Sequence, residues 1–127
     1  MDVLIRYGFT IEEIKIMMDT NDEIGDVEDS TVNELISILE DNDCSESEIK
    51  NIFICNPFYL TNNSNSIKKL ISKLKEIGIT PLHLLFNSNP YILNMSDKEL
   101  DKLYNNKVKE GLSKEEIIDY INYNIIY

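Results

Sequence analysis

Two groups of charged side chains in this 127-residue sequence could bind a partner by electrostatic attraction. The first is a set of lysines that lie beside the apolar stripes of two predicted amphipathic helices. Its members are Lys68, Lys69, Lys73, Lys75, Lys98 and Lys102. Lysine ammonium groups contact phosphate oxygens, so the set is a candidate nucleic-acid-binding face whose affinity would fall steeply with salt. The alternative is an ordinary solvated helix face, balanced by the carboxylates that alternate with the lysines.

The second group is an acidic run near the N-terminus. Its members are Asp19, Asp22, Glu23, Asp26, Glu28 and Asp29. Residues 1–42 hold twelve acidic and two basic residues, a net charge of −10, while the whole chain has a net charge of −11. Such a surface could dock a basic protein or mimic the phosphates of a nucleic acid. The alternative is a merely soluble outer face of a terminal unit.

Neither a catalytic site nor a cofactor or metal site is predicted. The acidic run lacks the alternating ligands and the closing glutamate of a calcium loop. His83 is the single histidine, and Cys44 and Cys55 lie in no nucleophile-like context, so both cysteines are expected to fill the core. Zinc-ligand spacings and glycine-rich phosphate loops are missing from a chain with four glycines. We therefore expect no enzyme.

A phrase that occurs four times identifies the elements that must position these charges. The copies begin at Gly8, Asp43, Gly78 and Gly111, which are 35, 35 and 33 residues apart. A period of this size is typical of a helical-repeat array. Each copy predicts a helix start through a hydroxyl N-cap residue, and the four caps are Thr10, Ser45, Thr80 and Ser113.

Three of the four caps are followed three residues later by glutamate, which completes a capping box. The third copy has His83 at that place, and Pro81 at the first helical position is expected to compensate. Apolar residues flank every cap as a hydrophobic staple, including Ile79 with Leu84 in the third copy. The glycines before the staples predict left-handed residues that end the preceding helix.

Two further signals complete each unit. Asn56-Pro57 and Asn89-Pro90 predict the end of one helix and the start of a short helical turn, whose aromatic and aliphatic residues would fill the core. An apolar stripe with helical spacing then predicts a second long helix. The stripe is Val32, Leu35, Ile36 and Leu39, and it recurs as Ile67, Leu70, Ile71 and Leu74. Each unit is thus predicted to be helix, short helix, helix.

The sequence therefore predicts an all-α fold, a short helical-repeat solenoid in one domain. We expect units at about 8–42, 43–77 and 78–110, followed by a closing helix at 111–127. A repeat array of this kind usually offers a surface for binding a macromolecule. With two cysteines and no signal peptide or long apolar segment, an intracellular, cytoplasmic protein without membrane contact is expected.

The text from Gly78 to Leu93, continued by the segment from Ser96 to Ile117, resembles the mitochondrial transcription termination factor (mTERF) repeat family. The resemblance is best from Asp43 to Ile118. It implies a curved stack of three-helix units with a groove that, in many members, is strongly basic and binds nucleic acid. This chain departs from that pattern, because its first unit has a net charge of −10.

We expect a non-enzymatic binding module whose partner is a protein, bound through the concave face or the acidic first unit. Nucleic-acid binding through the lysines is the alternative, although a net charge of −11 disfavours it. A third hypothesis is an acidic decoy that inhibits a nucleic-acid-binding protein.

Overall fold

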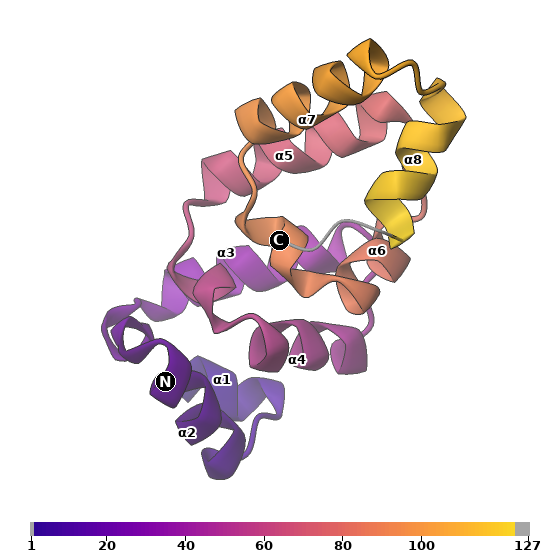
Figure 1. Ribbon diagram of the computed structural model, residues 1–127. Coiled ribbons are helices and arrows are strands. Elements are labelled where there is room, and N and C mark those ends of the chain that lie inside the picture. Colours follow the sequence, from indigo (N-terminus) through magenta and orange to yellow (C-terminus); the bar gives the residue numbers. More distant parts are fainter. Residues whose placement is uncertain (1, 124–127) are drawn as a thin grey trace.

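The computed structural model describes residues 2–123, and in that range it consists of helices and the short segments that join them (Figure 1). The long helices are α1 (Asp2–Tyr7), α2 (Ile11–Thr20), α3 (Asp29–Glu40), α4 (Glu46–Cys55), α5 (Ser64–Ile77), α6 (Leu82–Ser88), α7 (Asp97–Lys109) and α8 (Lys114–Tyr123). Three short 3-10 helices follow α2, α4 and α6, namely η1 (Asp22–Asp26), η2 (Pro57–Thr61) and η3 (Pro90–Asn94). The predicted order of helix, short helix, helix is confirmed three times.

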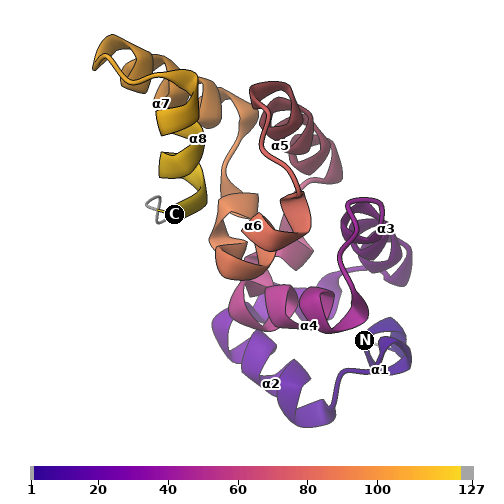
Figure 2. The same ribbon diagram turned by 90° about the vertical axis from the view of Figure 1, so that its right-hand side faces the viewer.

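Equivalent helices of successive units pack side by side. Helix α4 lies between α2 and α6, while α1, α3, α5 and α7 form a second row, and η2 contacts both η1 and η3. Figures 1 and 2 show the resulting ascent of the chain from α1 and α2 at one end to α7 and α8 at the other. The predicted all-α solenoid is therefore confirmed. The proposed unit boundaries lie at the turns after α3, α5 and α7, and residues 124–127 of the predicted closing helix lie outside the described residues.

The three capping boxes predicted in the repeated phrase are all present. The hydroxyls of Thr10, Ser45 and Ser113 accept hydrogen bonds of 3.1–3.2 Å from the N–H three residues later. The glutamate at that position accepts in turn from the N–H of the cap residue, over 2.8–3.0 Å. Gly8, Gly78, Gly111 and Asp43 adopt positive φ angles at the ends of the preceding helices, as predicted.

The capping glutamates should make the stability of the array sensitive to acid. The pKa of Glu13, Glu48 and Glu116 is lowered, chiefly because each carboxylate accepts a hydrogen bond from the backbone of its cap. A carboxyl group with a lowered folded pKa contributes stability that is complete above its unfolded pKa, about 4.3. That contribution is lost as the pH falls through the folded pKa.

We therefore expect Tm to fall less between pH 7 and pH 3 in the triple variant Glu13→Gln, Glu48→Gln, Glu116→Gln than in the wild type. Glutamine keeps the cap acceptor but does not titrate. A matched control replaces the exposed Glu12, Glu28 and Glu115 by glutamine. If the capping variant and the control showed the same change of Tm with pH, the capping carboxylates would not be the source of the acid sensitivity.

The prediction for the third cap was wrong. Helix α6 begins at Leu82 and its N-cap is Pro81, with φ −79° and ψ 143°, so Thr80 caps nothing. The one-residue shift leaves Leu84 58% exposed and buries Leu85 in its place. His83 cannot return the hydrogen bond that glutamate gives in the other units. Its Nδ1 lies instead 3.0 Å from the carboxylate of Glu48 in the preceding unit.

The Asn-Pro segments follow the ends of α4 and α6, as predicted. The side chains of Asn56 and Asn89 make no cap hydrogen bond, although the 3-10 helices do start at the prolines. Asn56 is fully buried, and its Nδ2 donates to the Pro90 carbonyl over 3.0 Å. Its amide also pairs with that of Asn94 in both directions, again over 3.0 Å. The hydrogen bonds of Asn56 thus link the start of η2 to η3.

The short helices fill the core with only part of their apolar residues. Tyr59 and Ile92 are fully buried, as expected, whereas Phe58 and Tyr91 are 46% and 42% exposed. With three residues per turn, a 3-10 helix that buries one side must turn another toward solvent.

The two cysteines differ in their surroundings. Cys44 lies in the core, but Cys55 is exposed at the end of α4, so its expected role as core filler was wrong.

Candidate binding surfaces

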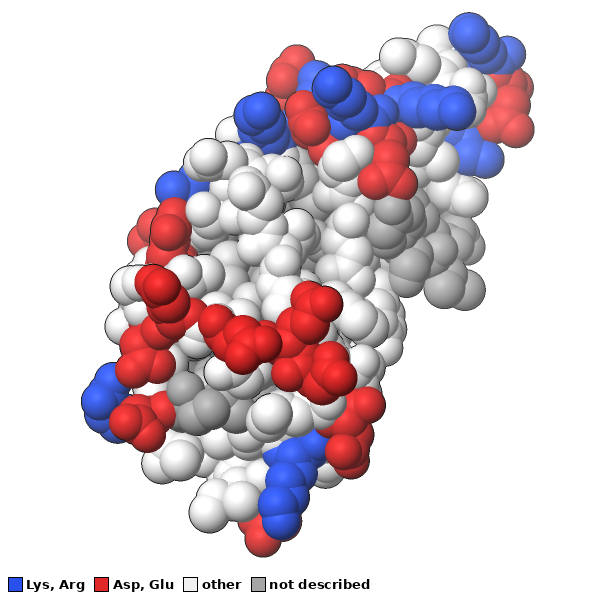
Figure 3. Space-filling model, turned by 90° about the vertical axis from the view of Figure 1, so that its left-hand side faces the viewer, with Lys and Arg blue, Asp and Glu red and all other residues white. Residues whose placement is uncertain are grey.

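The six acidic residues singled out in the sequence form one continuous region of the first unit, the acidic surface. Asp19 lies in the last turn of α2, Asp22, Glu23 and Asp26 belong to η1, and Glu28 is the N-cap residue of α3, which begins at Asp29. All six side chains are exposed. Figure 3 shows carboxylates gathered across the lower half of this face of the molecule. Three of the six carboxylates are on η1, where a 3-10 helix that packs one side on the core turns its other side to solvent.

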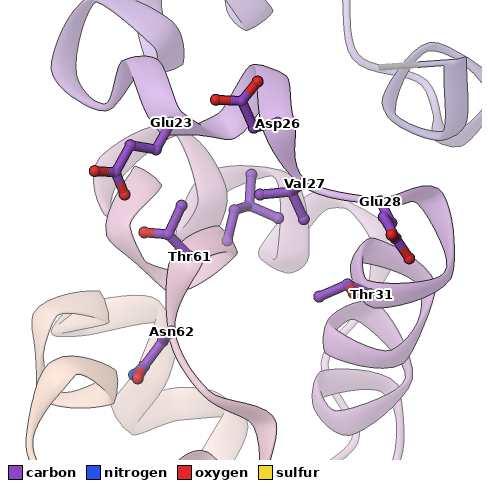
Figure 4. A pocket seen from close by; sticks show the side chains of 8 residues that line it. Glu23, Asp26, Val27, Glu28, Thr31, Thr61 and Asn62 are labelled. Atoms are coloured by element: carbon purple, nitrogen blue, oxygen red, sulfur yellow. The ribbon is translucent and has the colours of Figure 1, made fainter.

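Part of the acidic surface lines a groove of about 500 Å³ (Figure 4). Glu23 and Asp26 project from η1, and Glu28 lies across from them at the start of α3. The remaining lining residues are Val27, Thr31, Leu60, Thr61 and Asn62. The groove therefore combines carboxylates with hydroxyl, amide and apolar groups. Sequence analysis missed these five residues, since the groove exists only where η1 packs on η2.

Few cations neutralise the acidic surface. Arg6 approaches Asp29 at the edge of the surface, with 3.8 Å between guanidinium nitrogen and carboxylate oxygen. The other five carboxylates form no ion pair within residues 2–123. Because like charges held together in solvent attract a complementary surface, this region favours a basic partner.

The six candidate lysines do not form one basic surface. Lys68 lies 3.4 Å from Glu34 on α3, whereas Lys73 lies 2.9 Å from Asp101 on α7. These two lysines therefore point to opposite sides of α5, which packs between α3 and α7. The hydrogen bond that Lys73 donates to the Asp101 carboxylate is the main reason why the pKa of Lys73 is raised. Lysines and carboxylates alternate over the upper end of the molecule in Figure 3.

Four of the candidate lysines remain available for contact. They are Lys69 and Lys75 on α5 and Lys98 and Lys102 on α7, and all four are exposed. In the described part of the chain none of them forms an ion pair. The structure thus reduces the predicted lysine face to four solvated side chains on two adjacent helices.

The residues of potential chemical reactivity are held in structural roles. Burial, followed by the charge of Glu48, raises the pKa of the Cys44 thiol to about 12, which disfavours the reactive thiolate at neutral pH. The Cys55 thiol donates to the side-chain oxygen of Asn51 over 3.4 Å. No cluster of His, Cys, Asp or Glu side chains among the described residues is arranged to hold a metal ion.

No helix between residues 2 and 123 has both the length and the apolar character needed to cross a membrane. In comparison with known proteins, the family model described as mTERF matches residues 18–123. The matched range contains η1, η2 and η3 and all members of both candidate surfaces. No curated protein and no solved structure matches the chain.

Proposed function

The chain belongs to the mTERF family, and we propose that it is a non-enzymatic module that binds another protein through its acidic surface. The family is one of nucleic-acid-associated helical-repeat proteins that act by binding macromolecules. The proposal specifies the kind of macromolecule for this member and the face that it uses.

The observation that carries the proposal is the contrast between the two candidate surfaces. The acidic surface has five exposed carboxylates without an ion pair in the described residues, and it borders a groove with apolar and polar lining. Two of the six lysines are instead paired with carboxylates of neighbouring units. Phosphates are repelled by a first unit of net charge −10, whereas a basic protein surface is attracted.

A charge reversal on η1 tests this proposal. We expect Asp22→Lys with Glu23→Lys to reduce capture of the partner from a lysate of the source cell by about tenfold, since complementary charges steer and hold the complex. The control Glu115→Lys with Asp119→Lys changes the net charge equally on α8, where both side chains are exposed. Quantitative mass spectrometry of proteins retained by wild type and control, but released by the η1 variant, measures the effect. Equal losses from the two variants would contradict the proposal.

Nucleic-acid binding is the second candidate, and it is favoured by the four exposed lysines that form no ion pair within residues 2–123. A labelled DNA or RNA that binds the wild type at low salt, and that Lys69→Glu with Lys102→Glu releases, would support it. The acidic decoy is distinguished by competition. Free nucleic acid should then displace the chain from the captured partner, and Asp22→Lys with Glu23→Lys should prevent capture.

A further inference from the structure

We propose that the three 3-10 helices form an edge that binds an extended peptide segment of the partner, with basic residues at one end and apolar side chains at the other. This inference rests on the proposed function, because it names the part of the partner that the acidic surface recognises. It adds two exposed aromatic residues that neither candidate surface contains, Phe58 and Tyr91.

The geometry of a 3-10 helix defines the edge. With three residues per turn, side chains at positions i and i+3 lie on the same side of the helix. The second and fifth positions of each five-residue helix therefore share a face. These positions are Glu23 and Asp26 in η1, Phe58 and Thr61 in η2, and Tyr91 and Asn94 in η3. We call these six residues the 3-10 edge.

The aromatic residues of the 3-10 edge lie on the solvent side of their helices. Phe58 and Tyr91 are 46% and 42% exposed, although Tyr59 and Ile92 directly after them are completely buried. The two exposed rings occupy the same position in successive units, 33 residues apart. Aromatic side chains are the commonest anchors of protein interfaces, because they bury a large area with few rotatable bonds.

The 3-10 edge is continuous with the groove of the acidic surface. Glu23, Asp26 and Thr61 belong to the edge and also line the groove. Thr61 is fixed there by a hydrogen bond of 2.9 Å from the side chain of Asn21. Since η1 packs on η2 and η2 on η3, the edge changes in order from carboxylates to a phenylalanine and then to a tyrosine.

The order of these residues determines the charge of the segment that can bind and the spacing of its side chains. The carboxylates of η1 attract lysine or arginine and repel phosphates, which excludes a nucleic acid that stacks its bases on the two rings. Packed helices lie about 8–10 Å apart, which an extended chain spans with about three residues. The expected segment therefore carries a basic residue, an apolar residue about three positions away, and a second apolar residue about six positions away.

An array of immobilised 12-residue peptides tests the inference. The peptides carry two lysines and two leucines or phenylalanines at every spacing, beside peptides with the same charge and serine in place of the apolar residues. The full-length protein should bind peptides with spacings near three and six residues at least about tenfold better than the serine peptides. Phe58→Ser with Tyr91→Ser should abolish that preference. The control Leu84→Ser removes an apolar side chain that is 58% exposed on α6, and it should keep the preference.

Each other outcome overturns the inference. It is wrong if no peptide binds better than its serine counterpart, or if Phe58→Ser with Tyr91→Ser binds as the wild type does. It is also wrong if a single-stranded oligonucleotide binds the wild type and this variant releases it. A partner that is released by Asp22→Lys with Glu23→Lys, but retained by Phe58→Ser with Tyr91→Ser, would leave the proposed function standing and refute the edge alone. Circular dichroism confirms that the variants keep their helices.

Discussion

Replacing Phe53 by alanine should lower the free energy of unfolding by about 3–5 kcal/mol, the usual cost of removing a buried aromatic ring. Phe53 is completely buried in α4. Its ring centroid lies 5.7 Å from that of Phe9, in the first unit, and 5.5 Å from that of Tyr59. Since small domains unfold with about 5–15 kcal/mol, a loss of this size removes much of the stability of the array.

The position of Phe53 explains why the effect should extend beyond its own unit. Tyr59, its neighbour in the stack, donates a hydrogen bond of 2.7 Å from its hydroxyl to the Leu35 carbonyl in α3. The three rings thus connect the first two units, and repeat arrays depend on such contacts between neighbours. Urea denaturation followed by circular dichroism measures the change. The control Phe58→Ala removes a ring that is 46% exposed and should cost less than about 1 kcal/mol. Similar midpoints for the two variants would contradict the assigned role of Phe53.

The features that the sequence predicted correctly depend on residues close to one another in the chain. A capping box needs only a hydroxyl residue and a glutamate three positions later, as at Ser45 and Glu48. A left-handed helix end needs only a residue that tolerates positive φ, as at Gly78. The period of the apolar residues then determines which helices stack, so the solenoid followed from the sequence as well.

The features that were missed depend on residues about 35 positions apart. The His83 ring contacts the Glu48 carboxylate on α4, and α6 begins one residue later than its local sequence indicates. Asn56 bonds to η3 instead of capping η2. The local sequence does not reveal such contacts, because these residues could form either a local helix cap or a contact with another unit. The packing of the units determines which of the two forms.

The candidate surfaces also combine residues that are close in sequence with residues that come from other units. The acidic surface was predicted because its six residues are neighbours in sequence and the 3-10 helix between two long helices keeps them in solvent. The groove beside it was not, since Thr61 and Asn62 come from the next unit. The ion pairs of Lys68 with Glu34 and of Lys73 with Asp101 could not be predicted either, because the two carboxylates lie on neighbouring helices.

Replacing Asn56 by aspartate should uncouple the second and third units. The substitution preserves size and shape but removes the donor that serves the Pro90 carbonyl and the Asn94 side chain, each over 3.0 Å. It also places a charge at a completely buried position. An unpaired buried charge of this kind costs roughly 3–5 kcal/mol. Asn105→Asp, at an exposed position on α7, adds the same charge and should cost little.

The pH dependence of the Asn56→Asp variant identifies the cause of its instability. Burial raises the pKa of a carboxyl group in the folded state above its unfolded value of about 3.9, so the penalty is complete above the folded pKa. As the pH falls through that pKa, the protonated aspartate regains a donor and the penalty relative to the wild type shrinks. We therefore expect the difference in Tm between wild type and variant to narrow from pH 7 to pH 5. A constant difference would assign the loss to the missing hydrogen-bond donor instead of the charge. Hydrogen exchange shows where stability is lost. Amides in α6 and α7 should lose protection before those in α2, because the link of α2 to η2 through Asn21 remains intact.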